Sequence, residues 1–330
     1  MEFDSDAFII VGGVPDPVGG VTNYIYRLAR KDKDHVKAVF DLYPSESKKD
    51  ISPVCHVRPN RLPLLSLFFY LMKKNCDIYF NFSGVLGFLV VFLMPKRRGV
   101  RWFLTLHNGA IKERLESSRL SLFLAKLGAR RVDQIGYLSS SQRQAFELLG
   151  VREENLRQVS SFIPINKSDI EPIDINAFGE VTDFLKQGIP YFVISGYPTK
   201  IYQHLEVLQV FERLWDVGHR MKLVAFWYGD DSEDILESLK VRFGESPHAQ
   251  FYWGMGADRF LSVLSKSSGY IRMNTVDSFG VAVAEAVMLG VPAIASNVCS
   301  RYSGSETVDA NDFRALEEFI LRRIGQGREK

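Results

Sequence analysis

Short runs of β-branched and aromatic residues alternate with longer amphipathic stretches along almost the whole chain. This alternation is typical of repeated βαβ units built on a mainly parallel sheet. In the first half it predicts strands at 8–11, 36–40, 77–82, 102–106 and 134–138, and helices at 21–31, 111–127 and 141–149. In the second half it predicts strands at 191–195, 222–227, 249–252, 269–273 and 292–296, and helices at 203–217, 231–241, 257–266 and 281–289. We therefore expect a doubly wound α/β fold.

The alternation weakens between about residues 166 and 190, where prolines and glycines interrupt it. A chain of 330 residues is long for a single core and sufficient for two domains. We therefore predict two Rossmann-like domains, 1–165 and 166–310, facing each other across a cleft. The amphipathic end of the chain predicts a C-terminal helix within 311–330, with packing back on the N-terminal domain as one option.

The two halves differ in charge. Divided near Ile165, the first half carries 24 Lys and Arg against 16 Asp and Glu, a net charge of +8, and the second carries 17 against 23, a net charge of −6. A basic half indicates an anionic partner, such as a phosphate-bearing ligand, a membrane surface or nucleic acid, or simply a solvated basic surface. No sequence motif supports nucleic-acid binding, so we expect none.

Cysteine usage and the chain start favour a cytoplasmic protein. Cys55, Cys76 and Cys299 lie far apart without CxxC spacing, which argues against disulfides or a zinc site. The first ten residues are acidic where a secretion signal is basic. Two apolar runs, 62–72 and 85–94, are too short to span a bilayer and are flanked by basic residues. Either helices in a membrane interface or buried helices produce that pattern.

A glycine cluster follows the first predicted strand, from Gly12 to Gly20. Glycines there let backbone NH groups approach an anion at a helix N-terminus. The spacing is not GxGxxG and the segment contains two prolines, so a tight dinucleotide turn is disfavoured. Two further interpretations stay open: a dehydrogenase in which Asp41 binds a ribose, and a loop with a purely structural role.

His107 follows the predicted strand at 101–106, at its carboxyl end. Such a histidine can orient a hydroxyl group or contact a sugar, although a single histidine is often a structural hydrogen-bond partner.

The segment from Asn274 to Pro292 carries the most specific pattern in the chain. A predicted strand ends at Met273, a loop carries Asp277, and Gly280 begins a helix whose first NH groups can hold a phosphate. Glu285 falls more than one turn into that helix, among apolar residues. A carboxylate there needs a partner, which a bound ribose or a neighbouring protein group can supply.

Asp277 and Glu285, with Ser278-Phe279-Gly280 between them and Gly290-Val291-Pro292 after them, resemble the acidic motif of retaining GT-B glycosyltransferases of family 4. The resemblance implies a GT-B fold with an acceptor-binding domain at 1–165 and a nucleotide-sugar-binding domain at 166–310. It implies catalytic roles for His107, Asp277 and Lys200. It implies donor-binding roles for Gly19, Gly20, Gly196, Lys200, Ser278, Phe279, Gly280, Val281 and Glu285.

The sequence departs from that family near Gly196. The family places an Arg and a Lys, which neutralise the leaving diphosphate, where this chain has Tyr197 and Tyr202. Lys200 is the nearest substitute, and Arg272 and Arg301 are further candidates. Without such a group the leaving charge lacks its main stabiliser. A catalytically inactive donor-binding or scaffolding subunit therefore remains the alternative.

The resemblance implies transfer of a hexosyl group, with retention, from a UDP- or GDP-linked sugar to a glycan or polyprenyl-diphosphate-linked acceptor. Surface polysaccharide assembly at the inner face of the plasma membrane fits the basic first half. We expect no cofactor and no metal. The acidic residues 230–234 offer clustered carboxylates for Mg²⁺, but helix capping explains them more simply.

Overall fold

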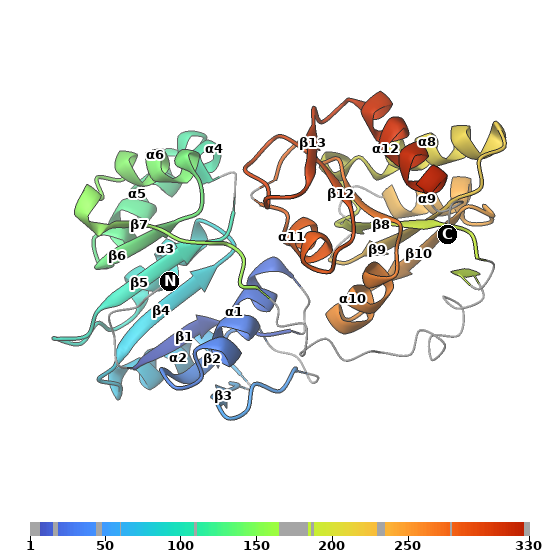
Figure 1. The fold of residues 1–330 in the computed structure, drawn as a ribbon. Helices are drawn as coiled ribbons and strands as arrows, with labels where there is room; N and C mark the ends of the chain where they lie inside the picture. The colour runs from blue at the N-terminus through green and yellow to red at the C-terminus, as the bar shows by residue number, and fades with distance from the viewer. Residues whose placement is uncertain are drawn as a thin grey trace. The chain divides into compact units, whose positions relative to one another are not determined.

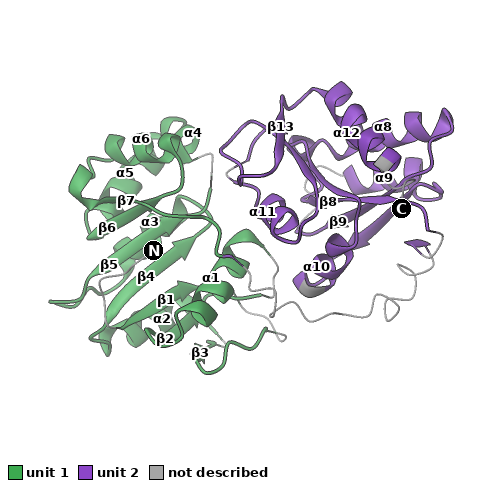
Figure 2. Cartoon of the chain, in the orientation of Figure 1, with its two compact units in different colours: residues 1–163 green, residues 164–330 purple. Residues whose placement is uncertain are grey.

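The computed structural model of the protein describes residues 7–15, 19–43, 48–59, 61–108, 111–164, 184–185, 188–229, 235–277 and 279–326. The chain divides into two compact units, Met1–Ile163 and Pro164–Lys330 (Figure 2). The division lies next to the boundary that the weakened periodicity predicts.

The first unit is built on one parallel sheet of seven strands in the order β3-β2-β1-β4-β5-β6-β7 (Figure 1). Its strands are β1 (Phe8–Gly12), β2 (Val36–Asp41), β3 (Cys55–Val57), β4 (Asp77–Phe82), β5 (Trp102–Leu106), β6 (Gln134–Tyr137) and β7 (Leu156–Gln158). Its helices are α1 (Gly20–Lys31), α2 (Pro63–Met72), α3 (Leu86–Leu93), α4 (Ile111–Glu116), α5 (Arg119–Ala129) and α6 (Ser140–Leu148).

Helices cover both faces of this sheet because each buried strand alternates its side chains between two cores. In β1, Ile9 and Val11 belong to a core that α2, α3, α5 and α6 share. Phe8 and Ile10 belong to a second core, packed against α1. The sheet is therefore doubly wound, as the alternating pattern predicts.

The second unit repeats this plan with six strands in the order β10-β9-β8-β11-β12-β13, all parallel. Its strands are β8 (Tyr191–Gly196), β9 (Lys222–Trp227), β10 (Ala249–Trp253), β11 (Gly269–Arg272), β12 (Ala293–Ser296) and β13 (Glu306–Val308). Its helices are α8 (His204–Asp216), α9 (Ile235–Phe243), α10 (Ala257–Ser265), α11 (Val281–Met288) and α12 (Phe313–Gln326). Cores on the two faces include α8, α9 and α12 on one and α10 and α11 on the other.

The C-terminal helix α12 buries its apolar face inside the second unit. Leu316, Phe319 and Ile320 lie in the same core as residues of β8 and α8, and the rings of Phe319 and Phe192 are 6.3 Å apart. The second sheet therefore covers the buried face of this helix, and the option that the helix also packs back on the N-terminal domain stays a prediction.

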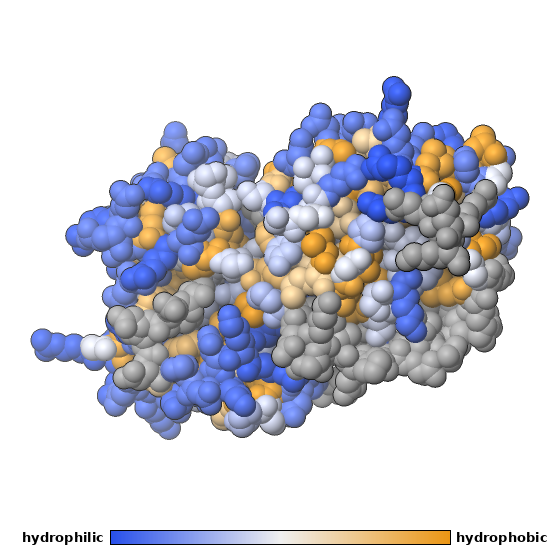
Figure 3. All heavy atoms as spheres, viewed as in Figure 1, coloured by the Kyte–Doolittle hydropathy of each residue, from blue (hydrophilic) through white to orange (hydrophobic). Residues whose placement is uncertain are grey.

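On the face drawn in Figure 3, hydrophilic residues cover most of the surface and hydrophobic residues are exposed in smaller areas among them. Within the part of the chain that the structure describes, no helix has the length and apolar character needed to cross a membrane.

Candidate functional site

Each sheet has a topological switch point, where successive connections leave in opposite directions. In the second unit this point lies between β8 and β11, which are neighbours in the sheet although β9 and β10 separate them in the sequence. Ligands of doubly wound proteins bind outside the carboxyl ends of such strands. A ligand of this unit is therefore expected to bind at the loops after Gly196 and Met273.

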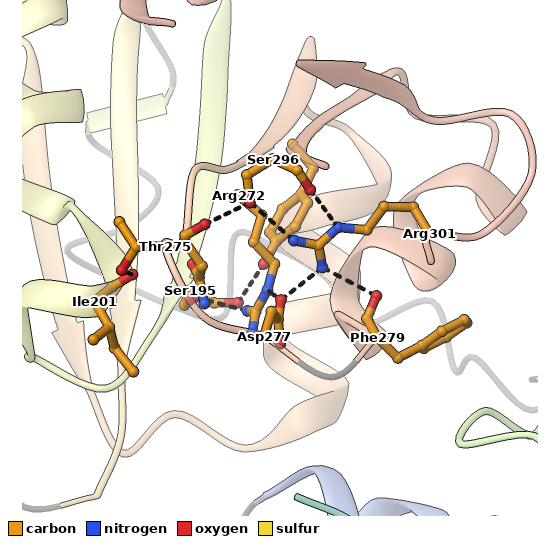
Figure 4. A network of polar contacts seen from close by, with 10 residues as sticks. Ser195, Ile201, Arg272, Thr275, Asp277, Phe279, Ser296 and Arg301 are labelled. Atoms are coloured by element: carbon orange, nitrogen blue, oxygen red, sulfur yellow. Dashed lines mark hydrogen bonds and ion pairs between the residues drawn. The ribbon is translucent and has the colours of Figure 1, made fainter. Parts of the chain in front are cut away.

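A buried cluster of one carboxylate and two guanidinium groups lies at that place (Figure 4). Arg272, the last residue of β11, donates from Nε to Oδ2 of Asp277 at 2.5 Å and from Nη2 to Oδ1 at 3.1 Å. Arg301 donates from Nη1 to Oδ2 of Asp277 at 2.6 Å. The three side chains are 8%, 8% and 2% exposed for Arg272, Asp277 and Arg301. The cluster therefore carries one positive charge in excess.

Backbone and hydroxyl groups fix both arginines. Arg301 donates to the carbonyl oxygens of Ser296 and Phe279 at 2.8 and 3.1 Å, and to the Ser296 hydroxyl at 3.0 Å. Arg272 reaches across to β8, where its Nη1 donates to the carbonyl oxygen of Ser195 at 3.4 Å. The guanidinium groups are thus held in place before any ligand arrives.

The ionisation of the cluster follows from its burial and charges. Burial alone raises the pKa of Asp277, but the guanidinium groups of Arg272 and Arg301 overcome it and hold the pKa well below the ordinary value. Burial works against the charge of Arg272, yet the Asp277 carboxylate raises the pKa of that guanidinium well above its ordinary value. Asp277 and Arg272 therefore stay charged across the physiological range.

Gly280 brings the cluster to the N-terminus of α11. Its φ of 76° lies in the left-handed region, which glycine adopts without strain. A Cβ atom there would lie 2.6 Å from Nη1 of Arg301 and 3.2 Å from the Arg272 side chain. Because glycine has no side chain, no side-chain cap occupies the N-terminus of α11, and the first turn of the helix carries no acidic residue. The backbone NH groups at a helix N-terminus, the helix dipole and the excess charge of the cluster all favour an anion here.

The segment after Gly196 contributes aromatic rings. The ring of Tyr202 lies against Gly196, where a Cβ atom would approach it to 2.0 Å, and the Arg272 guanidinium lies 5.2 Å from the centre of that ring. Tyr197 packs against Gly229 in the same way, and its ring centre is 4.8 Å from that of Tyr228. Arg272 therefore supplies a cation beside the tyrosine that replaces the family's lysine.

Most of the other residues predicted to bind the donor belong to the second unit as well. Lys200 is exposed in a short 3-10 helix, Lys200–Tyr202. Glu285 lies in α11 and is 5% exposed. Phe279 offers its carbonyl oxygen to Arg301, and Val281 is the first residue of α11. Ser278 lies outside the described residues.

In the first unit, His107 lies at the carboxyl end of β5, next to β4. Its backbone NH donates to the carbonyl oxygen of Phe82 at 2.8 Å, and its Nε2 lies 3.0 Å from Oδ1 of Asn81. Its ring centre is 4.6 Å from that of Tyr24 in α1. Burial lowers the pKa of His107 to about 3, so the ring is neutral at physiological pH. With Nε2 donating to Asn81, Nδ1 is the acceptor nitrogen.

The glycine cluster after β1 has two parts with different roles. A Cβ atom on Gly12 would lie 2.3 Å from the Ile25 side chain, and one on Gly13 would lie 2.2 Å from the Tyr43 ring. These two glycines are required for packing. Gly19 and Gly20 begin α1, and a Cβ atom on Gly20 would meet nothing within 4 Å. Packing does not explain those two, which leaves anion access as their predicted role.

The Asp41 carboxylate binds protein groups that hold the loop after β1 in place. Lys48 Nζ and His56 Nε2 both lie 3.1 Å from its Oδ2, and the NH groups of Val14 and Tyr43 donate to its oxygens. Its exposed fraction is 2%. The dehydrogenase alternative, in which Asp41 binds a ribose, is therefore disfavoured because protein groups already occupy the carboxylate.

Groups of three or more His, Cys, Asp or Glu side chains able to hold a metal ion are absent from the described ranges. The acidic segment 230–234 and Gly109 lie outside those ranges.

The fold is shared with solved glycosyltransferase structures. HepE from Anabaena, solved in complex with UDP-glucose, is 13% identical, with a TM-score of 0.70 over 97% of this chain and 90% of HepE. Sucrose-phosphate synthase from Thermosynechococcus elongatus is 16% identical, with a TM-score of 0.66 over 98% and 90%. The lipopolysaccharide outer core galactosyltransferase WaaB is 12% identical, with a TM-score of 0.58 over 97% and 90%.

No protein-family model matches the sequence, and no curated protein matches it in sequence with significance. The structural likeness therefore concerns the fold: the chain has the GT-B fold, with two Rossmann-like domains, and the predicted fold class is confirmed.

Sequence reasoning missed the way the site is assembled. It placed Arg272 and Arg301 only as candidates, and it assigned no role to Asn81 or Ser296. Arg272 ends one strand and Arg301 lies in the loop after the next, and this position near strand ends is the signal that pointed to them. Their contact with Asp277 depends on the order of β8, β11 and β12 in the sheet, which periodicity does not reveal.

Proposed function

We propose that this protein is a metal-independent retaining glycosyltransferase that moves a hexosyl group from a nucleotide diphosphate sugar to an acceptor hydroxyl. The observation that carries the proposal is the cationic cluster of Arg272, Asp277 and Arg301 at the N-terminus of α11. It combines a motif that resembles the acidic motif of family 4 with two cations that can take the place of the Arg and Lys that the family has at the positions of Tyr197 and Tyr202. HepE, which has the same fold, was solved with UDP-glucose and with UDP and glucose.

The donor would bind with its diphosphate against the first NH groups of α11 and the two guanidinium groups. Charge-assisted hydrogen bonds from Arg to phosphate are short and strong, and fixed donors need no rearrangement. Glu285, one turn further along α11, would accept hydrogen bonds from the ribose hydroxyls.

In the reaction, the bond between the anomeric carbon and the diphosphate oxygen breaks, and its electron pair stays on the diphosphate. The acceptor oxygen bonds to the same face of the anomeric carbon, and its proton passes to the leaving phosphate. Arg272 and Arg301 would stabilise the charge that develops on the diphosphate. A cation pair in this position removes the need for a bound metal in that step.

Asp277 and His107 would orient the sugar. Arginines hold both oxygens of Asp277, but a carboxylate has about four acceptor positions, so a sugar hydroxyl can still bond to it. His107 is neutral, because burial lowers its pKa to about 3, and its Nδ1 can accept a sugar hydroxyl. It would position the substrate without transferring a proton. Gly19 and Gly20 would let the acceptor and the phosphate approach the backbone of α1.

The acceptor would be a glycan or a polyprenyl-diphosphate-linked sugar used in surface polysaccharide assembly. The first unit carries the excess of Lys and Arg, which suits an acceptor with phosphate groups. The protein would then work in the cytoplasm at the inner face of the plasma membrane, where nucleotide sugars and lipid-linked acceptors meet.

The decisive experiment is a panel of UDP- and GDP-sugars tested for binding by calorimetry and for hydrolysis or transfer, with and without EDTA. Glu285→Ala is the donor-site variant, and Glu245→Ala, an exposed glutamate of the same unit, is the matched control. Binding that Glu285→Ala weakens and Glu245→Ala leaves unchanged supports the proposal. No binding to wild type, or equal binding by Glu285→Ala, contradicts it. The anomeric configuration of the product, read by NMR, tests retention.

A donor-binding or scaffolding subunit without activity is the second candidate. This function is favoured by Tyr197 and Tyr202 at the positions of the family's Arg and Lys. It is also favoured by the two ion pairs that Asp277 already forms with Arg272 and Arg301. Donor binding without hydrolysis or transfer, over the panel and with candidate acceptors, would favour this function.

A further inference from the structure

Helix α2 is apolar on the side that faces away from the protein. Its sequence, Pro63-Leu-Leu-Ser-Leu-Phe-Phe-Tyr-Leu-Met72, contains no charged residue. Only Leu67 and Leu71, which are one turn apart, are buried against the first core. These two buried side chains lie on one face of the helix, and they do not account for the apolar residues on the opposite face.

Four large apolar side chains form a ridge on that opposite face. Leu62, Leu65, Phe69 and Met72 are 68%, 51%, 55% and 49% exposed. Their spacings of three, four and three residues place them in one row along the helix. We call these four residues the α2 ridge. Such a row is normally the part of a helix that enters an apolar environment.

The backbone at the start of the ridge is strained. Leu62, the N-cap of α2, has φ 46° and ψ 63°, the left-handed conformation that a branched side chain disfavours. Its side chain is 68% exposed, so no burial in the core compensates. Leu62 therefore adds an exposed apolar side chain at the N-terminal end of the ridge.

The segments around the ridge are rich in basic residues, and the acids Asp77 and Asp133, which border these segments, pair with Arg101 and Lys96. The segments 61–76, 83–101 and 117–131, which include α2, α3 and α5, contain eleven Lys and Arg and no Asp or Glu. Arg97 donates to the carbonyl oxygen of Met72 at 3.0 Å, and Lys74 lies 4.5 Å from the centre of the Tyr70 ring. These two contacts bring cations from different segments to the C-terminal end of the ridge.

We propose that the α2 ridge docks on a bilayer that contains anionic phospholipids, with the helix lying in the membrane interface. The four ridge side chains would enter the boundary between headgroups and acyl chains, and Lys73, Lys74 and Arg97 would contact the lipid phosphates. A second copy of the chain fits less well, because apposed ridges would bring two sets of cations together, while Asp77 and Asp133 already pair with Arg101 and Lys96. A nucleic acid would satisfy the cations and leave the ridge in water.

The test is co-sedimentation of the full chain with vesicles of phosphatidylcholine alone and with about 30% phosphatidylglycerol, without donor or acceptor. The double variant Leu65→Ser, Phe69→Ser removes the centre of the ridge. Val241→Ser, an 80% exposed apolar residue on α9 in the other unit, is the matched control. We expect binding to the anionic vesicles that falls about tenfold or more in the ridge variant and not in the control.

A second variant guards against misfolding of the first. Phe69→Trp keeps the ridge apolar, and its emission should shift to shorter wavelength with anionic vesicles only, whereas Val241→Trp should not respond. Raising the salt concentration should weaken binding, since screening reduces the attraction of basic residues to the lipid surface. Equal sedimentation of ridge variant and wild type, or binding without preference for anionic vesicles, would overturn the proposal. So would a ridge-dependent dimer that does not bind vesicles. None of these readouts depends on transferase activity, so failure here would count against the proposed membrane location and leave the proposed transfer reaction untouched.

Discussion

Both units contain a buried carboxylate at a strand end, and the two are used differently. Asp41, at the end of β2, is held by Lys48 and His56 and accepts the NH groups of Val14 and Tyr43. Those backbone contacts close the loop that follows β1. The cluster around Asp41 therefore stabilises the fold and offers little to a ligand.

Asp277 is held by two arginines, and its cluster keeps one positive charge in excess beside the N-terminus of α11. The glycines show the same contrast. Gly13 is enclosed by the Tyr43 ring and the Asp41 carboxylate, whereas Gly280 lies against the two guanidinium groups. The same arrangement of strand, loop and acid thus serves loop closure in one unit and supports anion binding in the other.

The largest effect should come from removing each acid. Asp277→Ala leaves two buried guanidinium groups without their carboxylate, which should cost about 3–5 kcal/mol of unfolding free energy. Asp41→Ala should cost less, about 2 kcal/mol, because it takes the carboxylate from one lysine, one imidazole and two backbone NH groups rather than from two buried guanidinium groups. Hydrogen-exchange mass spectrometry on the full chain measures the opening energy in each unit separately.

A smaller loss of unfolding free energy in Asp277→Ala than in Asp41→Ala would contradict this comparison of the two acids. Asp277→Asn, which keeps the shape and removes the charge, is the control for a packing defect. A saturating nucleotide diphosphate should restore part of the loss in Asp277→Ala, because its phosphates can replace the missing carboxylate.

The next effect concerns nucleotide affinity. Arg301→Met removes one guanidinium and leaves Asp277 paired with Arg272, so UDP affinity should fall about 10- to 100-fold, the value of one or two charge-assisted hydrogen bonds. Lys48→Met removes the equivalent cation in the first unit and should change UDP affinity less than about twofold while lowering stability. Titration calorimetry measures both. Equal losses of affinity would mean that both clusters bind the nucleotide.

Periodicity was sufficient to find the main strands and helices. The strand predicted at 36–40 is β2, Val36–Asp41, and the helix predicted at 281–289 is α11, Val281–Met288. The three-residue edge strands β3, β7 and β13 carry too few residues for a periodic signal, and they were not predicted. Regular patterns thus identify elements, whereas short edge strands depend on the neighbour with which they pair.

The partners of Asp277 could not be read from the sequence for a different reason. Arg301 lies 24 residues further along the chain, and it reaches Asp277 because β11 and β12 pair side by side. The apolar run at 62–72 shows the same limit. Its sequence is compatible with a buried or an interfacial helix, and the structure gives a helix with one face in the core and one face exposed.

Acid should open the two units at different pH values. The pKa of Asp41 lies below its ordinary value of 3.8: burial raises it, but the contacts with His56, Tyr43 and Lys48 lower it further. A depressed pKa contributes stability that is present above the unfolded value and is lost as the pH falls through the folded value. The pKa of Asp277 is lowered much further, so its contribution should persist to lower pH.

We therefore expect the first unit to lose protection at a higher pH than the second, between about pH 4 and pH 2. Burial also lowers the pKa of His107 in the first unit and of His204 and His248 in the second, and the stability that these neutral rings contribute starts to be lost as the pH falls below their ordinary value of 6.5. A variant of Asp41 therefore separates the effect of the carboxylate from that of the histidines. Far-UV circular dichroism combined with hydrogen exchange over this range provides the measurement. Asp41→Asn should flatten the acid dependence of the first unit, and simultaneous opening in wild type would contradict the comparison.

The smallest effect should come from Lys200→Ala. Lys200 is exposed, and solvent and salt screen an exposed ammonium group, so it should stabilise the leaving diphosphate less than the buried pair does. We expect turnover to fall about two- to fivefold at unchanged donor affinity, against a much larger fall for Arg301→Met. Steady-state kinetics with the best donor measures both. A loss beyond about a hundredfold in Lys200→Ala would reverse the assignment. It would mean that the charge near Gly196 stabilises the leaving group, and that the Asp277 cluster, like that of Asp41, mainly stabilises the fold.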